Sequence, residues 1–360
     1  MSKETCMTKK DILKRIIKIT GSLAIVILVL YLLQCLLVPK YADAVVEGNF
    51  VAEYYEEEDK DFDVIFVGDC EVYENFSPVT LWREYGINSY IRGSANQFIW
   101  QSYYLLEDAL RYSTPKVVVF NIQSLQYNTP EDEPNAEPYN RMTLEGMEWS
   151  KSKIDAINAS MTKDESMIDY IFPILRYHSR WNELSMDDVK YMFSRKKSTH
   201  NGYYMRVDVK PATNVPTGMQ LTNYDFGDNA WKYLDKMRRL CEENGITLLL
   251  IKAPSLYPYW YPQWDEQVVE YAKQYNLRYI NMIDIKEEIG IDYTTDTYDA
   301  GLHMNLSGAE KCATYLGRIL SEELEVPDKR TDEKYQRIWE RNIEEYEAEK
   351  EAQYIKYGMK

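Results

Sequence analysis

The chain has 360 residues, 45% of them hydrophobic, which is enough to bury a large core in one main domain. Its net charge of −16 excludes nucleic-acid binding through a basic surface, because such binding needs cations that displace phosphate counterions. The five cysteines show neither a Cys-x-x-Cys pair nor metal-ligand spacing, and there are only three histidines, so we expect no metal and no cofactor.

The first forty residues combine a basic segment with an apolar run. Five cations of the basic segment at residues 1–18 (Lys9, Lys10, Lys14, Arg15 and Lys18) precede residues 19–38 (ITGSLAIVILVLYLLQCLLV), which match the ~20 residues with which a helix crosses a bilayer. The positive-inside rule places the N-terminus in the cytoplasm, which predicts a single-pass cell-membrane protein with an extracellular catalytic domain. Cleavage as a signal peptide is the alternative, because Ala42-Asp43-Ala44 has the small-x-small form.

An alternating strand and helix pattern follows an acidic linker predicted at residues 39–61. The first strand, FDVIFV at 62–67, is stopped by Gly68-Asp69, and Cys70 opens the next helix. Further strands are expected at 87–93, 117–122, 246–251 and 277–282, with helices at 97–112, 229–245, 265–275 and 308–320. This order predicts an α/β fold, a three-layer αβα sandwich around a central parallel sheet.

The pattern divides the α/β domain into residues 62–127 and 229–327, separated by a helical insertion or cap at 128–228. Within the insertion we expect His178, Arg180 and Trp181 to bind substrate, because aromatic faces stack on sugars and Arg binds carboxylates. An amphipathic helix lying on the core would contain the same residue types. His200 is expected to be solvated. Residues 328–360 are predicted to form a charged C-terminal helix.

Two residues at the predicted sheet edge could carry chemistry. Cys70 follows the carboxyl end of a parallel strand, where active crevices lie, and His303 stands in the loop before the last core helix, close to Asp299. Acyl transfer needs a nucleophile, a base and a group that orients the base, and these three residues fit the three roles. Alternatively, Cys70 is a small buried residue, or a redox thiol that pairs with Cys241 or Cys312.

The order of these blocks resembles the SGNH (GDSL-type) hydrolases. The resemblance rests on Gly68-Asp69-Cys70, Gly93, Asn121, Asp299 and His303. The anchor, the insertion and the loop from His303 to Gly308 are similar to the membrane-anchored branch, which includes alginate O-acetylation proteins and the D-alanyl transfer protein of teichoic acid synthesis. The resemblance implies a flavodoxin-like SGNH fold.

The resemblance also implies roles for individual residues. Cys70 takes the place of the family's serine nucleophile, His303 is the base, and Asp299 orients it. The backbone N–H groups of Cys70 and Gly93 and the side chain of Asn121 would form the oxyanion hole, with Asn96 or Gln97 as alternatives to Asn121. The family's acid stands three residues before the histidine, where this chain has Ala300, so the loop must bulge by one residue or Asp296 must serve.

These residues lead to an expected function. We expect a membrane-anchored extracytoplasmic acyltransferase or esterase that acts on O-acyl groups of a cell-envelope polysaccharide through an acyl-Cys70 intermediate. Its partners would be the polysaccharide, the membrane and a membrane-bound acyl-donor protein. The alternative is a catalytically inactive SGNH-like protein that binds glycan or scaffolds a cell-envelope complex.

Overall fold

The computed structural model of the protein describes residues 8–38, 47–193, 197–213, 215 and 217–359. The chain forms two units. The first contains the N-terminal residues up to 40 together with 166–196, and the second, called the main unit below, contains residues 41–165 and 197–360.

The main unit is built on a five-stranded parallel sheet. The strands are β1 (Val64–Gly68), β2 (Ser89–Gly93), β3 (Val117–Asn121), β4 (Thr247–Lys252) and β5 (Arg278–Asn281). They lie in the order β2-β1-β3-β4-β5, which is the flavodoxin-like order of doubly wound sheets. The predicted α/β class with a central parallel sheet is therefore confirmed.

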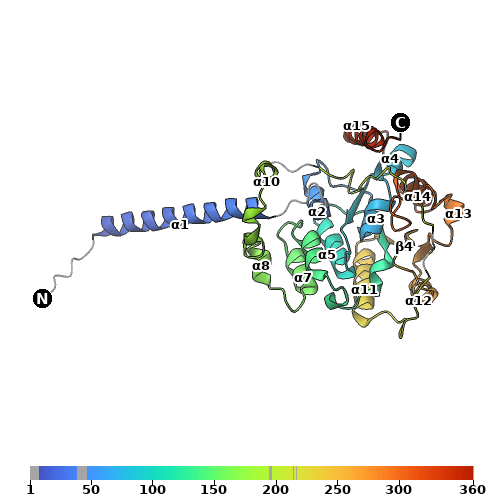
Figure 1. Cartoon of the computed structure of the whole chain (residues 1–360), viewed down its shortest axis with the longest axis horizontal. Helices are drawn as coiled ribbons and strands as arrows, with labels where there is room; N and C mark the ends of the chain where they lie inside the picture. The colour runs from blue at the N-terminus through green and yellow to red at the C-terminus, as the bar shows by residue number, and fades with distance from the viewer. Residues whose placement is uncertain (1–7, 39–46, 194–196, 214, 216, 360) are drawn as a thin grey trace. The chain divides into compact units, whose positions relative to one another are not determined.

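Both faces of the sheet are covered, which explains why its strands are continuous apolar runs. Val64 and Phe66 of β1 belong to a core cluster with residues of α14 and α15, while the intervening Ile65 and Val67 are equally buried on the opposite face. Figure 1 shows the helices around the strands. The helices next to the sheet are α3 (Cys70–Asn75), α4 (Pro78–Tyr85), α5 (Ile99–Ala109), α11 (Asp228–Glu243), α12 (Pro262–Gln274), α13 (Lys286–Ile289) and α14 (Leu306–Arg318).

Two further helices join the main unit from outside the alternating pattern. α2 (Glu47–Glu56) lies within the segment predicted as an acidic linker, and its Phe50, Val51 and Tyr54 are buried. α15 (Glu333–Lys356) buries Trp339, whose ring stacks on Trp82 with centroids 5.1 Å apart. The short segments η1 (Ile122–Gln126) and η4 (Ile319–Glu323) complete the described helical elements of this unit outside the insertion, and η2 (Pro130–Asp132) lies at the start of the insertion.

The predicted insertion is shared between the two units. Its first part forms α6 (Ala136–Leu144) and α7 (Lys151–Ser160), and α7 packs on α5 of the main unit. The expectation that His200 is solvated is wrong. His200 is buried, its ring packs edge-on against Tyr346 of α15, and its backbone pairs with Tyr203.

The first unit joins α1 to the second part of the insertion. α1 (Lys9–Leu37) is long and apolar enough to span a membrane, by length and composition. It packs against three of the short elements that follow in the insertion. These elements are α8 (Met167–Ile171), α9 (Ile174–Tyr177), η3 (His178–Asn182) and α10 (Met186–Tyr191), of which α9, η3 and α10 contact α1.

Candidate active site

The turn between β1 and α3 presents Cys70 at the edge of the sheet. Gly68 has a φ of +154°, and a Cβ there would lie 3.0 Å from Val72 and 3.1 Å from Asn121, so glycine is required. Asp69 caps α3 by accepting a hydrogen bond from the Glu71 N–H (3.1 Å). Cys70 is the first residue of α3 and is partly exposed. Because the strand order reverses between β1 and β3, this edge is where doubly wound sheets place their crevice.

The loop before α14 holds His303 in a fixed orientation. Asp299 accepts two hydrogen bonds from His303, one from the ring Nδ1 (Oδ2, 2.7 Å) and one from the backbone N–H (Oδ1, 2.8 Å). Ala300 and Gly301 both have positive φ, +71° and +101°, and they form the one-residue bulge that this spacing needs. Asp296 instead contacts Lys311 (2.6 Å), so Asp299 is the acid that faces the ring.

The second ring nitrogen of His303, Nε2, is available to interact with the Cys70 thiol. Nε2 is buried and makes no hydrogen bond of regular geometry within the described residues, while the imidazole and the Cys70 thiol each influence the other's pKa. Burial raises the pKa of the thiol to about 11, although His303 opposes this effect. Burial lowers the pKa of His303, but the charges of Glu74 and Cys70 and the Asp299 hydrogen bond outweigh it and hold that pKa well above 6.5. The geometry gives a cysteine, a basic histidine and an orienting aspartate.

A second carboxylate, which the sequence analysis missed, also faces His303. Glu74 accepts a hydrogen bond from the Tyr298 hydroxyl, and its Oε2 lies 3.7 Å from Nδ1 of His303. The Tyr298 ring lies nearly parallel to the imidazole, with centroids 6.0 Å apart, and the Arg206 guanidinium lies 4.2 Å from the Tyr298 ring centroid. Glu74 is four residues after Cys70 on the same helix, so the i, i+4 spacing was the signal that could have found it.

A buried polar network lies behind the Cys70 turn. The Asn121 amide donates to Asp69 (3.1 Å) and to Glu71 (3.0 Å), and its carbonyl oxygen accepts from the Ala253 N–H (3.0 Å). Lys252, fully buried, donates to Glu71 at 2.7 Å. Burial raises the pKa of Glu71 to about 7, and Lys252 opposes the shift. This network ties the ends of β3 and β4 to the turn that carries Cys70.

The predicted oxyanion donors have different surroundings. Both N–H donors of Asn121 serve the network just described. The Gln97 amide donates to the Ser94 hydroxyl (3.1 Å) and toward the Arg92 carbonyl (3.4 Å), and Asn96 occupies a turn position with φ +46°. Gly93 lies directly against the Cys70 turn, because a Cβ there would be 3.3 Å from the Asp69 carbonyl oxygen. Gly93 also lies opposite Gly68 in the parallel pairing of β1 and β2.

The three predicted substrate-binding residues belong to the other unit. Arg180 donates to the carbonyl of Leu37 at the end of α1 (2.5 Å) and to Asp188 (3.1 Å). The His178 ring contacts the Leu175 carbonyl (2.9 Å), and Trp181 is 73% exposed. Their contacts are within the α1 unit, so their role in substrate binding stays a prediction.

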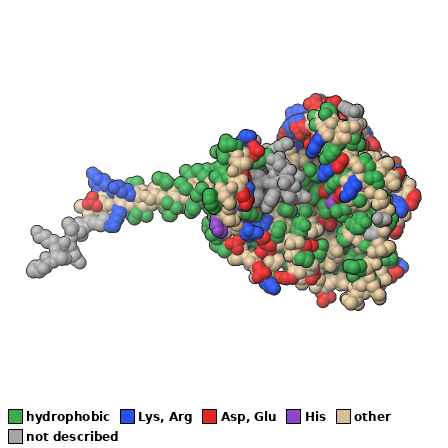
Figure 2. Space-filling view, in the orientation of Figure 1, with side chains coloured by type: hydrophobic (Ala, Val, Ile, Leu, Met, Phe, Trp, Pro, Cys, Tyr) green, Lys and Arg blue, Asp and Glu red, His purple; other side chains and the backbone are tan. Residues whose placement is uncertain are grey.

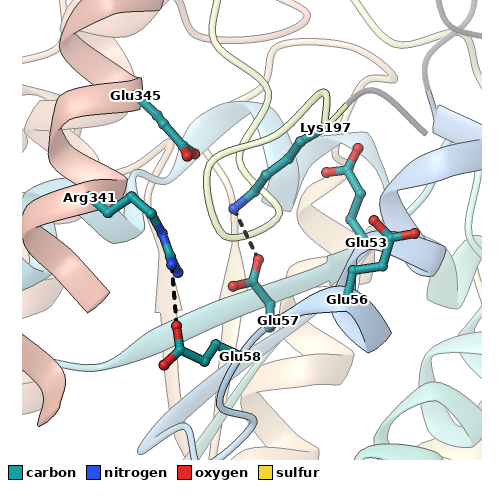
Figure 3. A pocket seen from close by; sticks show the side chains of 7 residues that line it. All are labelled: Glu53, Glu56, Glu57, Glu58, Lys197, Arg341 and Glu345. Atoms are coloured by element: carbon teal, nitrogen blue, oxygen red, sulfur yellow. Dashed lines mark hydrogen bonds and ion pairs between the residues drawn. The ribbon is translucent and has the colours of Figure 1, made fainter. Parts of the chain in front are cut away.

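The remaining functional candidates are accounted for within the described residues. Cys241 and Cys312 are buried free thiols, and no group of His, Cys, Asp and Glu side chains is arranged to hold a metal ion. A cavity of about 280 Å³ between α2 and α15 is lined by carboxylates and two cations (Figure 3). Its lining residues are Glu53, Glu56, Glu57, Glu58, Lys197, Arg341 and Glu345.

Fold and site together define an α/β protein with a cysteine, histidine and aspartate assembled at the switch point of a parallel sheet. No protein-family model, curated protein or solved structure matches the chain. Any function must therefore be argued from this geometry.

Proposed function

We propose that the protein is a membrane-anchored extracytoplasmic acyltransferase or esterase of SGNH type, acting on O-acyl groups of a cell-envelope polysaccharide. The observation that carries the proposal is the Asp299 to His303 hydrogen bond of 2.7 Å, which leaves Nε2 buried, with no regular hydrogen bond to the described residues, and within interaction range of the Cys70 thiol. A base held in one orientation, with its free nitrogen toward a thiol, is the arrangement that activates a nucleophile.

The chemistry proceeds in two transfers through one nitrogen. Nε2 of His303 takes the Cys70 proton, and the thiolate attacks the acyl carbonyl of the donor ester. The donor alcohol leaves with that proton, and the acyl group remains on Cys70 as a thioester. A polysaccharide hydroxyl or water then gives its proton to Nε2, attacks the thioester and releases the Cys70 thiolate, which regains that proton from the imidazolium. Asp299 and Glu74 stabilise the imidazolium that forms in each step.

The envelope setting is supported by α1 and by the resemblance in the sequence. A helix able to span a membrane would hold the catalytic unit at the bilayer surface, where a membrane-bound protein could supply the acyl group. The net charge of −16 disfavours broad docking onto a polyanion and is compatible with a hydroxyl-bearing acceptor.

The proposal is tested by intact-mass analysis after incubation with 4-nitrophenyl acetate as a small acyl donor. We expect one acyl group on the parent protein and none on Cys70→Ala. The matched control is Cys241→Ala, which removes a buried thiol elsewhere and should keep the adduct. An adduct that persists in Cys70→Ala, or its absence from the parent with every donor tried, would contradict covalent catalysis.

A second candidate, an inactive SGNH-like glycan-binding or scaffolding protein, is favoured by two observations. The pKa of Cys70 is raised to about 11, which keeps the thiol neutral near pH 7, and both donors of Asn121 are engaged in the buried network. This candidate predicts that Cys70→Ala and His303→Ala preserve cellular function while Trp181→Ala abolishes it. Complementation of a deletion strain distinguishes the two candidates.

A further inference from the structure

The segment from Met167 to Phe193, called the collar below, exposes an unusual number of large apolar side chains. Trp181, Met186 and Phe193 are 73%, 70% and 80% exposed. Five others on the collar are also exposed: Ile168, Ile171, Phe172, Leu175 and Val189. Exposed apolar residues gathered in one segment of this kind mark an interaction surface rather than ordinary solvent-facing positions.

The collar packs on the last turn of α1. Elements α9, η3 and α10 contact α1, and Figure 1 shows α8 and α10 beside the C-terminal end of that helix. Along α1 the residues up to Leu33 are exposed, residues 34–36 are partly covered, and Leu37 is buried. Arg180 of the collar donates to the Leu37 carbonyl (2.5 Å), which satisfies one of the free carbonyls at the helix end.

The position of this contact along α1 corresponds to a defined depth in a bilayer. The apolar run begins after Lys18 and ends at Val38, and at ~1.5 Å per residue it spans about 30 Å, the thickness of the hydrocarbon core. Its last turn therefore coincides with the boundary between hydrocarbon and headgroups. Figure 2 shows hydrophobic side chains along α1 and on the neighbouring collar.

The composition of the collar suits that boundary. Residues 167–193 contain four acids and three bases, and three of the acids are paired locally: Asp187 with Lys190 (2.7 Å), and Asp188 (3.1 Å) and Glu183 (3.7 Å) with Arg180. The collar is therefore nearly neutral, unlike the whole chain, and anionic lipids would not repel it. Phe and Trp next to paired charges are typical of segments that lie in the interfacial plane.

We propose that the collar is a membrane-interface surface, covered by the headgroup region of the same bilayer that α1 crosses. The proposal depends on α1 as a membrane span and is independent of the chemistry at Cys70. The lipid bilayer is favoured over a second copy or another protein because the apolar surface adjoins the end of the apolar run of α1. It also gives His178, Arg180 and Trp181 a lipid-facing setting in place of the predicted glycan-binding one.

Tryptophan fluorescence tests the proposal on the full chain. Of the eight tryptophans, Trp149 and Trp181 are the exposed ones, and α1 contains none. We would place one chain per nanodisc of 3:1 phosphatidylcholine to phosphatidylglycerol, with and without 6,7-dibrominated phosphatidylcholine. The emission attributed to Trp181, measured as parent minus Trp181→Phe, should fall at least twofold in the brominated discs.

The matched control is Trp149→Phe, which removes the other exposed indole from the main unit and should leave the bromine-dependent quenching of the protein unchanged. The same Trp181 emission intensity in brominated and unbrominated discs would overturn the proposal. A second copy cannot account for such a result, because each disc holds a single chain. Loss of quenching in Trp149→Phe to the same extent as in Trp181→Phe would also overturn it, because the lipid contact would then not be specific to the collar. Unchanged near-ultraviolet circular dichroism confirms that each variant is folded.

Discussion

The main unit has two regions rich in carboxylates, and they differ in what the carboxylates contact. At the sheet edge, Asp299 and Glu74 both face the imidazole of His303, which also interacts with the Cys70 thiol. In the cavity between α2 and α15, Glu57 pairs with Lys197 (3.1 Å) and Glu58 with Arg341 (3.2 Å), as Figure 3 shows.

The difference lies in which cation can release its proton. Glu74 and Asp299 act on an imidazole, a group that can give and take a proton near neutral pH, whereas Glu57 and Glu58 form ion pairs with Lys197 and Arg341. Glu53, at the cavity wall, accepts hydrogen bonds from the Ser198 and Thr199 N–H groups and from the Thr199 hydroxyl. The two regions therefore differ in what their carboxylates contact: a histidine next to a thiol at the sheet edge, and Lys, Arg, hydroxyl and backbone N–H groups in the cavity.

The largest effect is expected from removing that histidine. His303→Asn should lower the rate of Cys70 acylation about 10³-fold, because the thiol loses its base. The rate is measured by stopped-flow release of 4-nitrophenol. Lys197→Met, which removes the central cation of the other region, is the matched control and should acylate at the parental rate. Similar losses in the two variants would contradict the distinction between the regions.

A smaller loss is expected from the acid that orients the imidazole. Asp299→Asn should reduce the acylation rate about 10²-fold, since the amide stabilises the reactive tautomer and the imidazolium less well. Asp296→Asn is the control, because Asp296 pairs with Lys311 and does not touch the ring. If Asp296→Asn proved the more damaging in folded protein, the orientation of His303 would have to be assigned to that residue.

A change in pH dependence is expected from Glu74→Gln. Glu74 contributes to the raised pKa of His303, so the base form of the imidazole appears only at higher pH in the parent. Removing the Glu74 charge should move the rise of the iodoacetamide alkylation rate of Cys70 to lower pH, with a smaller change in maximal rate than Asp299→Asn causes. Glu57→Gln should leave the profile in place. A profile that does not move, or moves to higher pH, would rule out an electrostatic role for Glu74.

The smallest effect on acylation, with a visible effect on stability, is expected from Glu53→Gln. Burial raises the pKa of Glu53 to about 7, so the folded protein holds this proton more tightly than the unfolded chain does. Its contribution to stability is therefore lost as pH rises from 4.5 through 7. Relative to the variant, the parent should lose up to about 3 kcal/mol of unfolding free energy between pH 4.5 and 8.

Urea unfolding of the detergent-solubilised protein at both pH values measures this difference. Glu71, whose pKa is also raised to about 7, titrates in both proteins and cancels in the comparison. A constant difference between parent and Glu53→Gln across this pH range would show that Glu53 does not titrate there.

The sheet and the three central site residues could be predicted because their signals are local. The β-branched runs at Val64 and Val117 are uninterrupted, and Cys70 stands where the first run stops. His303 was placed by its position before the last core helix. The spacing of Asp299 and His303 requires either a one-residue bulge at Ala300 or the use of Asp296 as the acid, and the structure contains the bulge.

Apart from the i, i+4 spacing of Cys70 and Glu74, the features that the sequence does not reveal depend on contacts between residues distant in the chain. Tyr298 and Glu74 are far apart in the chain, and their hydrogen bond forms only once α3 meets the loop before α14. The acidic residues of α2 made this segment look like a solvent-exposed linker. One of them, Glu53, is buried because it accepts hydrogen bonds from residues 198 and 199, and such a distant contact cannot be predicted from the local sequence. His200 looked solvated because the residue that covers it, Tyr346, comes almost 150 positions later.

The position of α15 has a consequence for how the chain acquires its structure during synthesis. Trp339 fills the space over Trp82 and donates to the Asn88 side chain (3.0 Å), and Tyr346 lies 3.3 Å from the Ser77 hydroxyl. These contacts join the last helix to residues translated much earlier. A ribosome-bound chain would therefore carry an open apolar face over α4 until α15 has emerged, so this part of the core forms later than the sheet beneath it.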